Sequence, residues 1–171
     1  MLNEKITKMI NEQINKEFFS SYLYLAFSCY YASKNLTGFA NWYNVQAQEE
    51  KDHAMIFLNY LLDNGEEVEL ESLEKPEGRY SDFEAPLLAG LDHERFITAS
   101  INDIYAEALA QKDFRTVQFL DWFVKEQGEE EKNADELIQN FRLFGTDGKG
   151  LFMLDRELGA RTYTATTIDM I

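Results

Sequence analysis

Proline is nearly absent from this chain and is confined to one region. Only two of the 171 residues are proline, Pro76 and Pro86, and both lie in or beside one irregular stretch, 65–82 (GEEVELESLEKPEGRYSD). Proline interrupts helices, so its confinement to one stretch leaves the rest of the chain free to form long helices. On either side, apolar residues recur at the 3.6-residue spacing of an amphipathic α-helix. The sequence therefore predicts an all-α protein.

The apolar spacing predicts four long helices and a short fifth one. We expect them at about 3–33, 37–64, 82–111, 114–144 and 150–159. Thr37, which follows a short turn, is a candidate N-cap for the second helix, and Pro86 is tolerated in the first turn of the third. Residues 160–171 form a polar tail without a predicted structure. We expect a single domain over 1–171, with the bundle at about 3–144.

The lengths of the links predict how these helices are connected. Short turns join the first helix to the second and the third to the fourth, which predicts two antiparallel hairpins. A helix of about 28 residues is roughly 42 Å long at 1.5 Å per residue. The 18-residue stretch 65–82 can extend over roughly 60 Å, long enough to run the whole bundle. We therefore predict a four-helix bundle with one long crossover and a short C-terminal fifth helix.

Composition narrows the class of partner. The formal net charge of −15 argues against nucleic acid and anionic membranes, and it favours metal cations or basic partners, although it also suits a merely soluble protein. No run approaches 18 apolar residues, and the N-terminus lacks a signal-peptide pattern, so we expect neither a membrane span nor a signal peptide. The chain has a single cysteine, Cys29, which excludes an internal disulfide and a cysteine-based zinc site. A lone cysteine also fits a reducing, cytoplasmic location. We expect Cys29 to be a small core residue.

Each of the four long helices places a glutamate on its otherwise apolar face. In the second helix, Glu50 shares this face with His53, three residues later. The corresponding glutamates elsewhere are Glu17, Glu94 and Glu130. Measured from the centres of the short links, near 35 and 112, Glu17, His53, Glu94 and Glu130 each lie 18 residues away. Because antiparallel partners at equal distance from their turn meet at one level, we expect all five side chains to converge on one layer if the two hairpins are in register.

A layer of four buried carboxylates needs counter-charge, because carboxylates cannot all stay ionised in a core of low dielectric constant. No lysine or arginine is apparent on these faces. Protons, water or metal cations could each resolve the conflict. A ligand set that is rich in oxygen and holds one imidazole suits iron, manganese or zinc, but not calcium. Two divalent cations bridged by glutamates would neutralise four carboxylates, so we favour a metal site.

With these residues in view, the sequence resembles the bacterial non-haem ferritins over nearly its whole length. The resemblance rests on NEQINKEF (11–18), QEEKDH (48–53), Glu94, EQGEEEK (126–132) and the short fifth helix. It implies a first iron ligated by Glu17, Glu50 and His53. It further implies a second iron at Glu50, Glu94 and Glu130, with Gln127 nearby and Tyr24 beside the centre, and a third, weaker site at Glu49, Glu126, Glu129 and Glu130.

The same resemblance implies an activity and an assembly. Members of the family form a hollow shell of 24 subunits, in which Fe(II) is oxidised by O₂ or H₂O₂ and stored as a ferric oxyhydroxide mineral. Haem is not expected. Lys51 stands where haem-binding relatives carry a methionine, and Glu130 stands where they carry the histidine of a second Glu-x-x-His.

Several interpretations stay open. The acidic residues beside the layer, Glu49, Glu126 and Glu129, are either a solvated face or a transit route for iron. Gly128 either relieves crowding or is an accident, and His93 is expected at the surface. The apolar fifth helix, with Phe152, suggests a subunit contact. The rival functions are a di-iron oxygenase or peroxidase acting on an organic substrate, and a plain helical interaction module.

Overall fold

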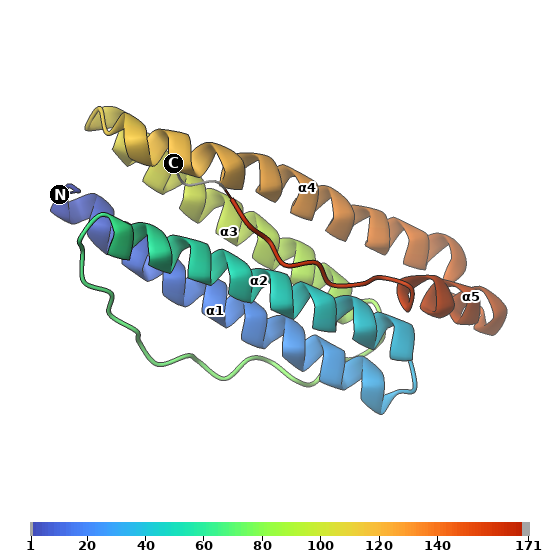
Figure 1. Ribbon diagram of the computed structural model, residues 1–171. Coiled ribbons are helices and arrows are strands. Elements are labelled where there is room, and N and C mark those ends of the chain that lie inside the picture. The colour runs from blue at the N-terminus through green and yellow to red at the C-terminus, as the bar shows by residue number, and fades with distance from the viewer. Residues whose placement is uncertain (1, 169–171) are drawn as a thin grey trace.

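The computed structural model describes residues 2–168; Met1 and residues 169–171 lie outside the described part. Its five helices are α1 (Glu4–Ser33), α2 (Thr37–Asp63), α3 (Ala85–Ala110), α4 (Phe114–Phe144) and α5 (Gly148–Leu158). The first four form an elongated bundle, and α5 lies across its end (Figure 1). The predicted all-α bundle with a short fifth helix is confirmed. No helix within residues 2–168 is both long enough and apolar enough to cross a membrane.

The two hairpins are closed by the same kind of turn. Asn35 and Lys112 each adopt positive φ, 60° and 59°, and each directly follows the C-cap residue of a helix. Backbone hydrogen bonds then return across each turn, from Leu36 N to Tyr31 O at 3.0 Å and from Asp113 N to Ala108 O at 2.9 Å. Residues in this left-handed conformation commonly end helices because they satisfy the last free carbonyls. These tight ends fix the register of each hairpin.

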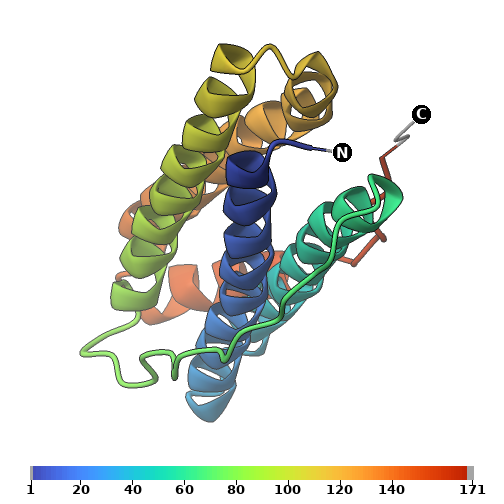
Figure 2. The ribbon, with the colours of Figure 1, turned by 90° about the vertical axis from the view of Figure 1, so that its left-hand side faces the viewer.

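The long link between α2 and α3 runs the length of the bundle, as its length predicted. It follows the outer side of α1 in extended form, shown in green in Figures 1 and 2. Asn11 and Asn15 of α1 hold it there through hydrogen bonds with the backbone of Glu69, at 2.8 Å from Asn11 Nδ2 and 3.3 Å from Asn15 Nδ2 to the carbonyl oxygen. Since the link returns to the opposite end, α2 and α3 are parallel.

The start of α2 corrects one sequence-based expectation. Thr37 is the first residue of α2 and not its N-cap, and Leu36 at the cap position supplies no side-chain hydrogen bond. The free donors of the first turn are instead met by Asp155 of α5, whose Oδ1 accepts from Gly38 N at 2.9 Å and Phe39 N at 3.0 Å. A carboxylate is favoured at this end by the helix dipole. Capping from a distant helix therefore docks α5 on the bundle.

The core has two apolar clusters separated by a polar layer. One, at the end nearer α5, is rich in aromatic side chains and includes Phe27, Tyr31, Phe39, Leu87 and Phe141. The other, at the opposite end, includes Ile6, Ile10, Phe57, Ile101 and Phe119. In each of the four long helices the predicted site residue lies, in sequence, between the members of these two clusters. The fold therefore seals the layer at both ends with apolar side chains.

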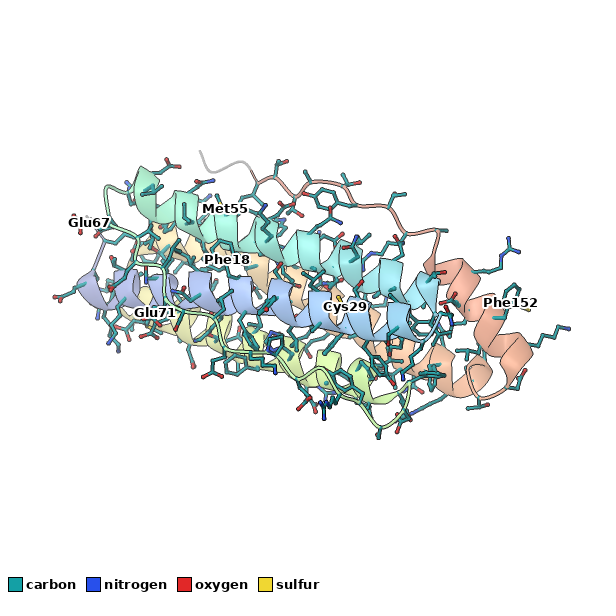
Figure 3. The ribbon with its side chains drawn as sticks, turned by 90° about the horizontal axis from the view of Figure 1, so that it is seen from below. Phe18, Cys29, Met55, Glu67, Glu71 and Phe152 are labelled. Carbon is teal, nitrogen blue, oxygen red and sulfur yellow. The ribbon has the colours of Figure 1, made fainter. Side chains whose placement is uncertain are left out.

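The exposures of Cys29, of His93 and of the α5 side chains are relevant to three other predictions from the sequence. Cys29 is exposed on α1 and is not a core residue, because it lies on the outward face of the helix (Figure 3). His93 is half-buried, not at the surface, and its Nε2 lies 2.7 Å from Ser20 Oγ. In α5, Leu154 and Leu158 are buried against the chain's own bundle, whereas Phe152 is 61% exposed. A subunit contact through Phe152 stays a prediction.

Candidate metal centre

The five predicted site residues all lie inside the bundle at one level. They come from four helices: Glu17 from α1, Glu50 and His53 from α2, Glu94 from α3 and Glu130 from α4, and none is more than 6% exposed. The equal spacing from the two short links placed them at this depth, and the helical period turned them inward. The convergence predicted from the sequence is therefore present in the fold.

Glu17, Glu50 and His53 form the tightest part of the group. One ligand atom of each lies within 4.8 Å of the others, and this is the only such group of three or more candidate ligands among residues 2–168. His53 Nδ1 is 3.4 Å from Glu50 Oε2. Within the described chain, Glu17 Oε2 and His53 Nε2 are buried and have no hydrogen-bond partner. Buried polar atoms are almost always paired, so these two atoms fit a site that takes a cation.

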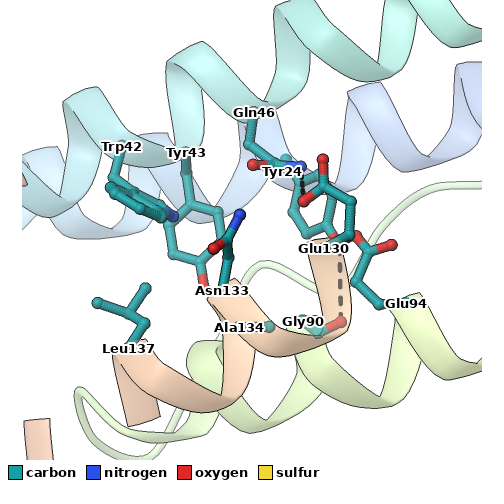
Figure 4. A pocket seen from close by; sticks show the side chains of 10 residues that line it. All are labelled: Tyr24, Trp42, Tyr43, Gln46, Gly90, Glu94, Glu130, Asn133, Ala134 and Leu137. Atoms are coloured by element: carbon teal, nitrogen blue, oxygen red, sulfur yellow. Dashed lines mark hydrogen bonds between the residues drawn. The ribbon is translucent and has the colours of Figure 1, made fainter. Parts of the chain in front are cut away.

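Glu94 and Glu130 are held beside this group by hydrogen bonds. The Tyr24 hydroxyl donates to Glu94 Oε1, and Gln127 Nε2 donates to Glu94 Oε2 at 3.0 Å. Gln46 Nε2 donates both to Glu130 Oε2 at 2.8 Å and to Glu50 Oε1 at 3.0 Å, so one amide joins α2 to α4 (Figure 4). The cavity beside these residues has a volume of about 20 Å³, which is room for about one water molecule.

Gln13 and Gln46 belong to the site although the sequence-based prediction did not include them. Gln13 Nε2 donates to Glu17 Oε1 at 2.7 Å, and Gln46 donates to Glu50 as described above. In both cases the glutamine lies four residues before the glutamate, on the same helical face. This spacing was the available signal. Each amide fixes one carboxylate oxygen; the other oxygen has no partner in Glu17 and faces His53 Nδ1 in Glu50.

Burial and charge set the protonation of the cation-free layer. Burial, and then the negative charge of Glu50, raise the pKa of both Glu17 and Glu94 to about 8. The same two causes raise the pKa of Glu130 well above its usual range. The layer without cations therefore holds protons on three of its four carboxyl groups at neutral pH.

Glu50 and His53 behave in the opposite way, as an ion pair. Burial opposes the charge on each, but their mutual attraction and hydrogen bonding outweigh it. The pKa of Glu50 is lowered, and that of His53 is raised to about 10. The imidazole also lies against aromatic rings, with the centroid of Trp122 at 5.5 Å and that of Phe123 at 6.0 Å. A cation that binds His53 must therefore displace its proton.

Comparison with known proteins identifies the family of this chain. Residues 7–144 match the family described as Ferritin-like domain. The chain belongs to the ferritin family. It is 36% identical to a bacterial non-haem ferritin of Campylobacter jejuni, over 91% of this chain and 93% of that protein. It is 35% identical to a probable bacterial non-haem ferritin-like protein of Haemophilus influenzae, over 93% and 96%.

Solved structures show the same likeness in three dimensions. An open-pore ferritin from the archaeon Archaeoglobus fulgidus superposes with a TM-score of 0.92 at 38% identity, covering 95% of this chain and 100% of that one. A closed form of the Archaeoglobus fulgidus ferritin, engineered by mutagenesis, gives 0.94 at 38% identity, covering 96% and 100%. The match includes both the bundle and nearly the full length of this ferritin chain.

The acidic residues expected at a third site do not form one group in this ferritin chain. Glu49 and Glu126 are half-buried, and Glu129 is exposed. Glu49 forms an ion pair with Arg161, and Glu129 Oε1 lies 3.7 Å from Lys125 Nζ. Burial raises the pKa of both Glu49 and Glu126. The third site stays a prediction, and the arginine at Glu49 was not foreseen.

Two further expectations concern Tyr24 and Gly128. Tyr24 is buried, stacks on Tyr43 with ring centroids 5.6 Å apart, and contacts the centre through Glu94. Its place beside the layer follows from its position seven residues after Glu17, two helical turns along the same face. At Gly128, an added Cβ would meet nothing within 4 Å in the described chain. Gly128 therefore relieves no crowding within its own subunit.

Proposed function

We propose that this protein oxidises Fe(II) at a paired site in the buried layer and stores the product as a ferric mineral inside a hollow homo-oligomer. Membership of the ferritin family supports iron storage. The observation that carries the finer proposal is the pair of buried, unpartnered atoms Glu17 Oε2 and His53 Nε2 in a carboxylate-rich group.

Iron enters this scheme as the substrate. Glu17, Glu50 and His53 take the first Fe(II), and Glu50, Glu94 and Glu130 take the second, so that Glu50 bridges the two. Four carboxylates and a neutral imidazole balance the charge of two divalent cations. Hard carboxylate oxygens bind Fe(III) more tightly than Fe(II), which lowers the cost of oxidation. Two Fe(II) ions give up two electrons, which, with two protons, reduce O₂ to H₂O₂ or H₂O₂ to two molecules of water.

The remaining side chains orient this substrate site. Tyr24 and Gln127 fix the carboxyl group of Glu94, and Gln46 fixes those of Glu50 and Glu130. Partners of this kind raise metal affinity by restricting the ligand to one orientation. They also leave Glu50 and Glu130 each with an oxygen free of the Gln46 amide.

The alternative, a di-iron oxygenase or peroxidase acting on an organic substrate, needs space beside the metals. The cavity at the layer is only about 20 Å³, far below the roughly 300 Å³ at which small-molecule pockets begin. This favours an inorganic substrate. For the assembly, we propose the family's shell of 24 subunits, with exposed Phe152 and Met153 of α5 as subunit contacts.

Iron loading tests the proposal. Metal-free protein is given Fe(II) in air, oxidation is followed by absorbance, and the product is sized. We expect soluble particles that hold hundreds of irons, with oxidation slowed at least tenfold in Glu130→Ala and His53→Ala. Glu136→Ala, which alters an exposed glutamate on α4, the helix of Glu130, is the matched control and should behave as the unaltered protein. Uptake that stops at two irons per chain, or unchanged oxidation in both site variants, would refute the proposal.

A further inference from the structure

The C-terminal tail returns along the bundle and contacts the metal centre. After α5, residues 160–168 run back beside α2, shown in red in Figure 1. Asn41 Nδ2 donates to the carbonyl oxygen of Arg161 at 2.9 Å. Asp52 Oδ2 accepts from Tyr163 OH at 2.7 Å and from Thr166 N at 2.9 Å. These contacts hold the tail on α2 on both sides of the level at which Glu49 lies.

The side chain of Arg161 is the point of closest approach. Its guanidinium carbon lies 4.2 Å from the ring centroid of Trp42. One nitrogen donates to Gln46 Oε1 at 2.9 Å, and the other forms an ion pair with Glu49. The side chain is only 19% exposed. A planar guanidinium suits such a site because it can stack on an aromatic ring and still donate in two directions.

Through Gln46, Arg161 acts on the buried glutamates. Since the amide oxygen of Gln46 accepts from Arg161, the amide nitrogen must face inward, where it donates to Glu50 and Glu130. Arg161 thereby fixes which end of this amide points at the centre. Two hydrogen bonds, from Arg161 to Gln46 and from Gln46 to Glu50, thus connect Arg161 to the proposed bridging ligand.

Arg161 is also the only ion-pair partner of Glu49 among residues 2–168. Glu49 directly precedes Glu50 and is half-buried, so its charge needs a partner at close range. A cation that bound the Glu49 carboxylate would occupy the place that the guanidinium holds. It would have to displace the arginine and loosen the tail.

We propose that Arg161 is a resident counter-cation that closes the Glu49 side of the centre, so that the docked tail limits the site to two divalent cations. Arg161 is a positioning residue in this account: it sets Gln46 and withholds Glu49, and it touches no substrate. The inference rests on the proposed function, because it assumes that the buried layer binds cations.

Calorimetric titration of the metal-free protein with Zn²⁺, which undergoes no oxidation, tests this. We expect two cations per chain for the unaltered protein and a third, weaker one for Arg161→Gln. Arg161→Met, which keeps an apolar stem over Trp42, is a second neutral variant and should also gain the third. Arg161→Lys retains the charge and should stay at two. Removing the Glu49 carboxylate as well, in Glu49→Gln/Arg161→Gln, should return the count to two.

The results that would overturn the proposed function differ from those that would overturn only the role of Arg161. If the unaltered protein binds no Zn²⁺ in the layer, the proposed function fails. If it binds two and both neutral variants also bind two, only the role of Arg161 is overturned. A third cation that persists in the double variant would place it away from Glu49 and would overturn the inference as well. Circular dichroism of each variant establishes that the bundle is folded before the titration.

Discussion

Cation binding to the buried layer should expel about four protons per chain at pH 7. The perturbation is the addition of two equivalents of Mn²⁺ to metal-free protein under nitrogen. Carboxylates and imidazole ligate in their deprotonated forms, so every proton held by the layer must leave. Because two divalent cations carry the charge of four protons, the layer stays near neutral throughout. The exchange of protons for cations is what permits these groups to be buried together.

The magnitude follows from the pKa values of the layer. With a pKa of about 8, Glu17 and Glu94 each hold about 0.9 proton at pH 7. His53, at about 10, and Glu130, well above its usual range, each hold about one. Glu50 holds none, because its pKa is lowered. At pH 9 Glu17 and Glu94 are nearly deprotonated, so the release should be smaller than at pH 7 by between about one and two protons.

Calorimetry in buffers of different ionisation enthalpy counts the protons directly. Because four protons leave when two cations bind, the binding should weaken about 10⁴-fold for each unit by which the pH falls below neutrality, or about 100-fold per cation. Glu12→Gln, which alters an exposed glutamate on α1, is the matched control and should leave the number of released protons unchanged. Release of one proton or fewer at pH 7, or an equal release at pH 7 and pH 9, would refute the protonation scheme.

Four further predictions test the packing and the layer. Gly38→Ala should lower the thermal midpoint, since its Cβ would lie 1.5 Å from the Asp155 carbonyl oxygen and push α5 away; overpacking typically costs about 1–3 kcal/mol. Gly128→Ala, with nothing within 4 Å, should instead raise it through about 1 kcal/mol of helix propensity. Tyr24→Phe removes the donor to Glu94 and should weaken Zn²⁺ binding by about 10-fold or more, while equal affinity would contradict a role in positioning. As the pH is raised from about 4.5 to 8, the metal-free protein should lose thermal stability, because Glu94 and the other buried acids keep their protons over this range only in the folded state. A thermal midpoint that increases as the pH is raised would contradict their burial as acids.

The helices and the depth of the site were predictable because both depend on local geometry. The 3.6-residue period decides which side chains share a face, and this put Glu17, Glu50 and Glu130 on the inner side before any tertiary contact was known. Two tight turns then set equal distances from the hairpin ends. The bounds of α1 and α4 agree with expectation to about a residue, because a capping residue, a tight turn and a periodic apolar face all coincide there.

Side chains whose partners are remote in sequence were not predictable in the same way. Local chemistry favours Thr37 as the cap of α2, but Asp155 takes that role from more than a hundred residues away. The offset of His93 from the apolar face predicts a surface position, yet Ser20 of α1 gives it a partner. The residue type of Cys29 alone predicts a place in the core, but its position on the outward face of α1 exposes it.

A bundle with a carboxylate on each inner face follows from the sequence, because helical periodicity and link length are properties of short segments. How those carboxylates are held depends on contacts between segments that are remote in the sequence. Gln46 could have turned either end of its amide to the centre, and Arg161 lies in a tail without any periodic signal. A hydrogen bond is specified only by where two groups meet in space, and these two meet because α5 turns the chain back along α2.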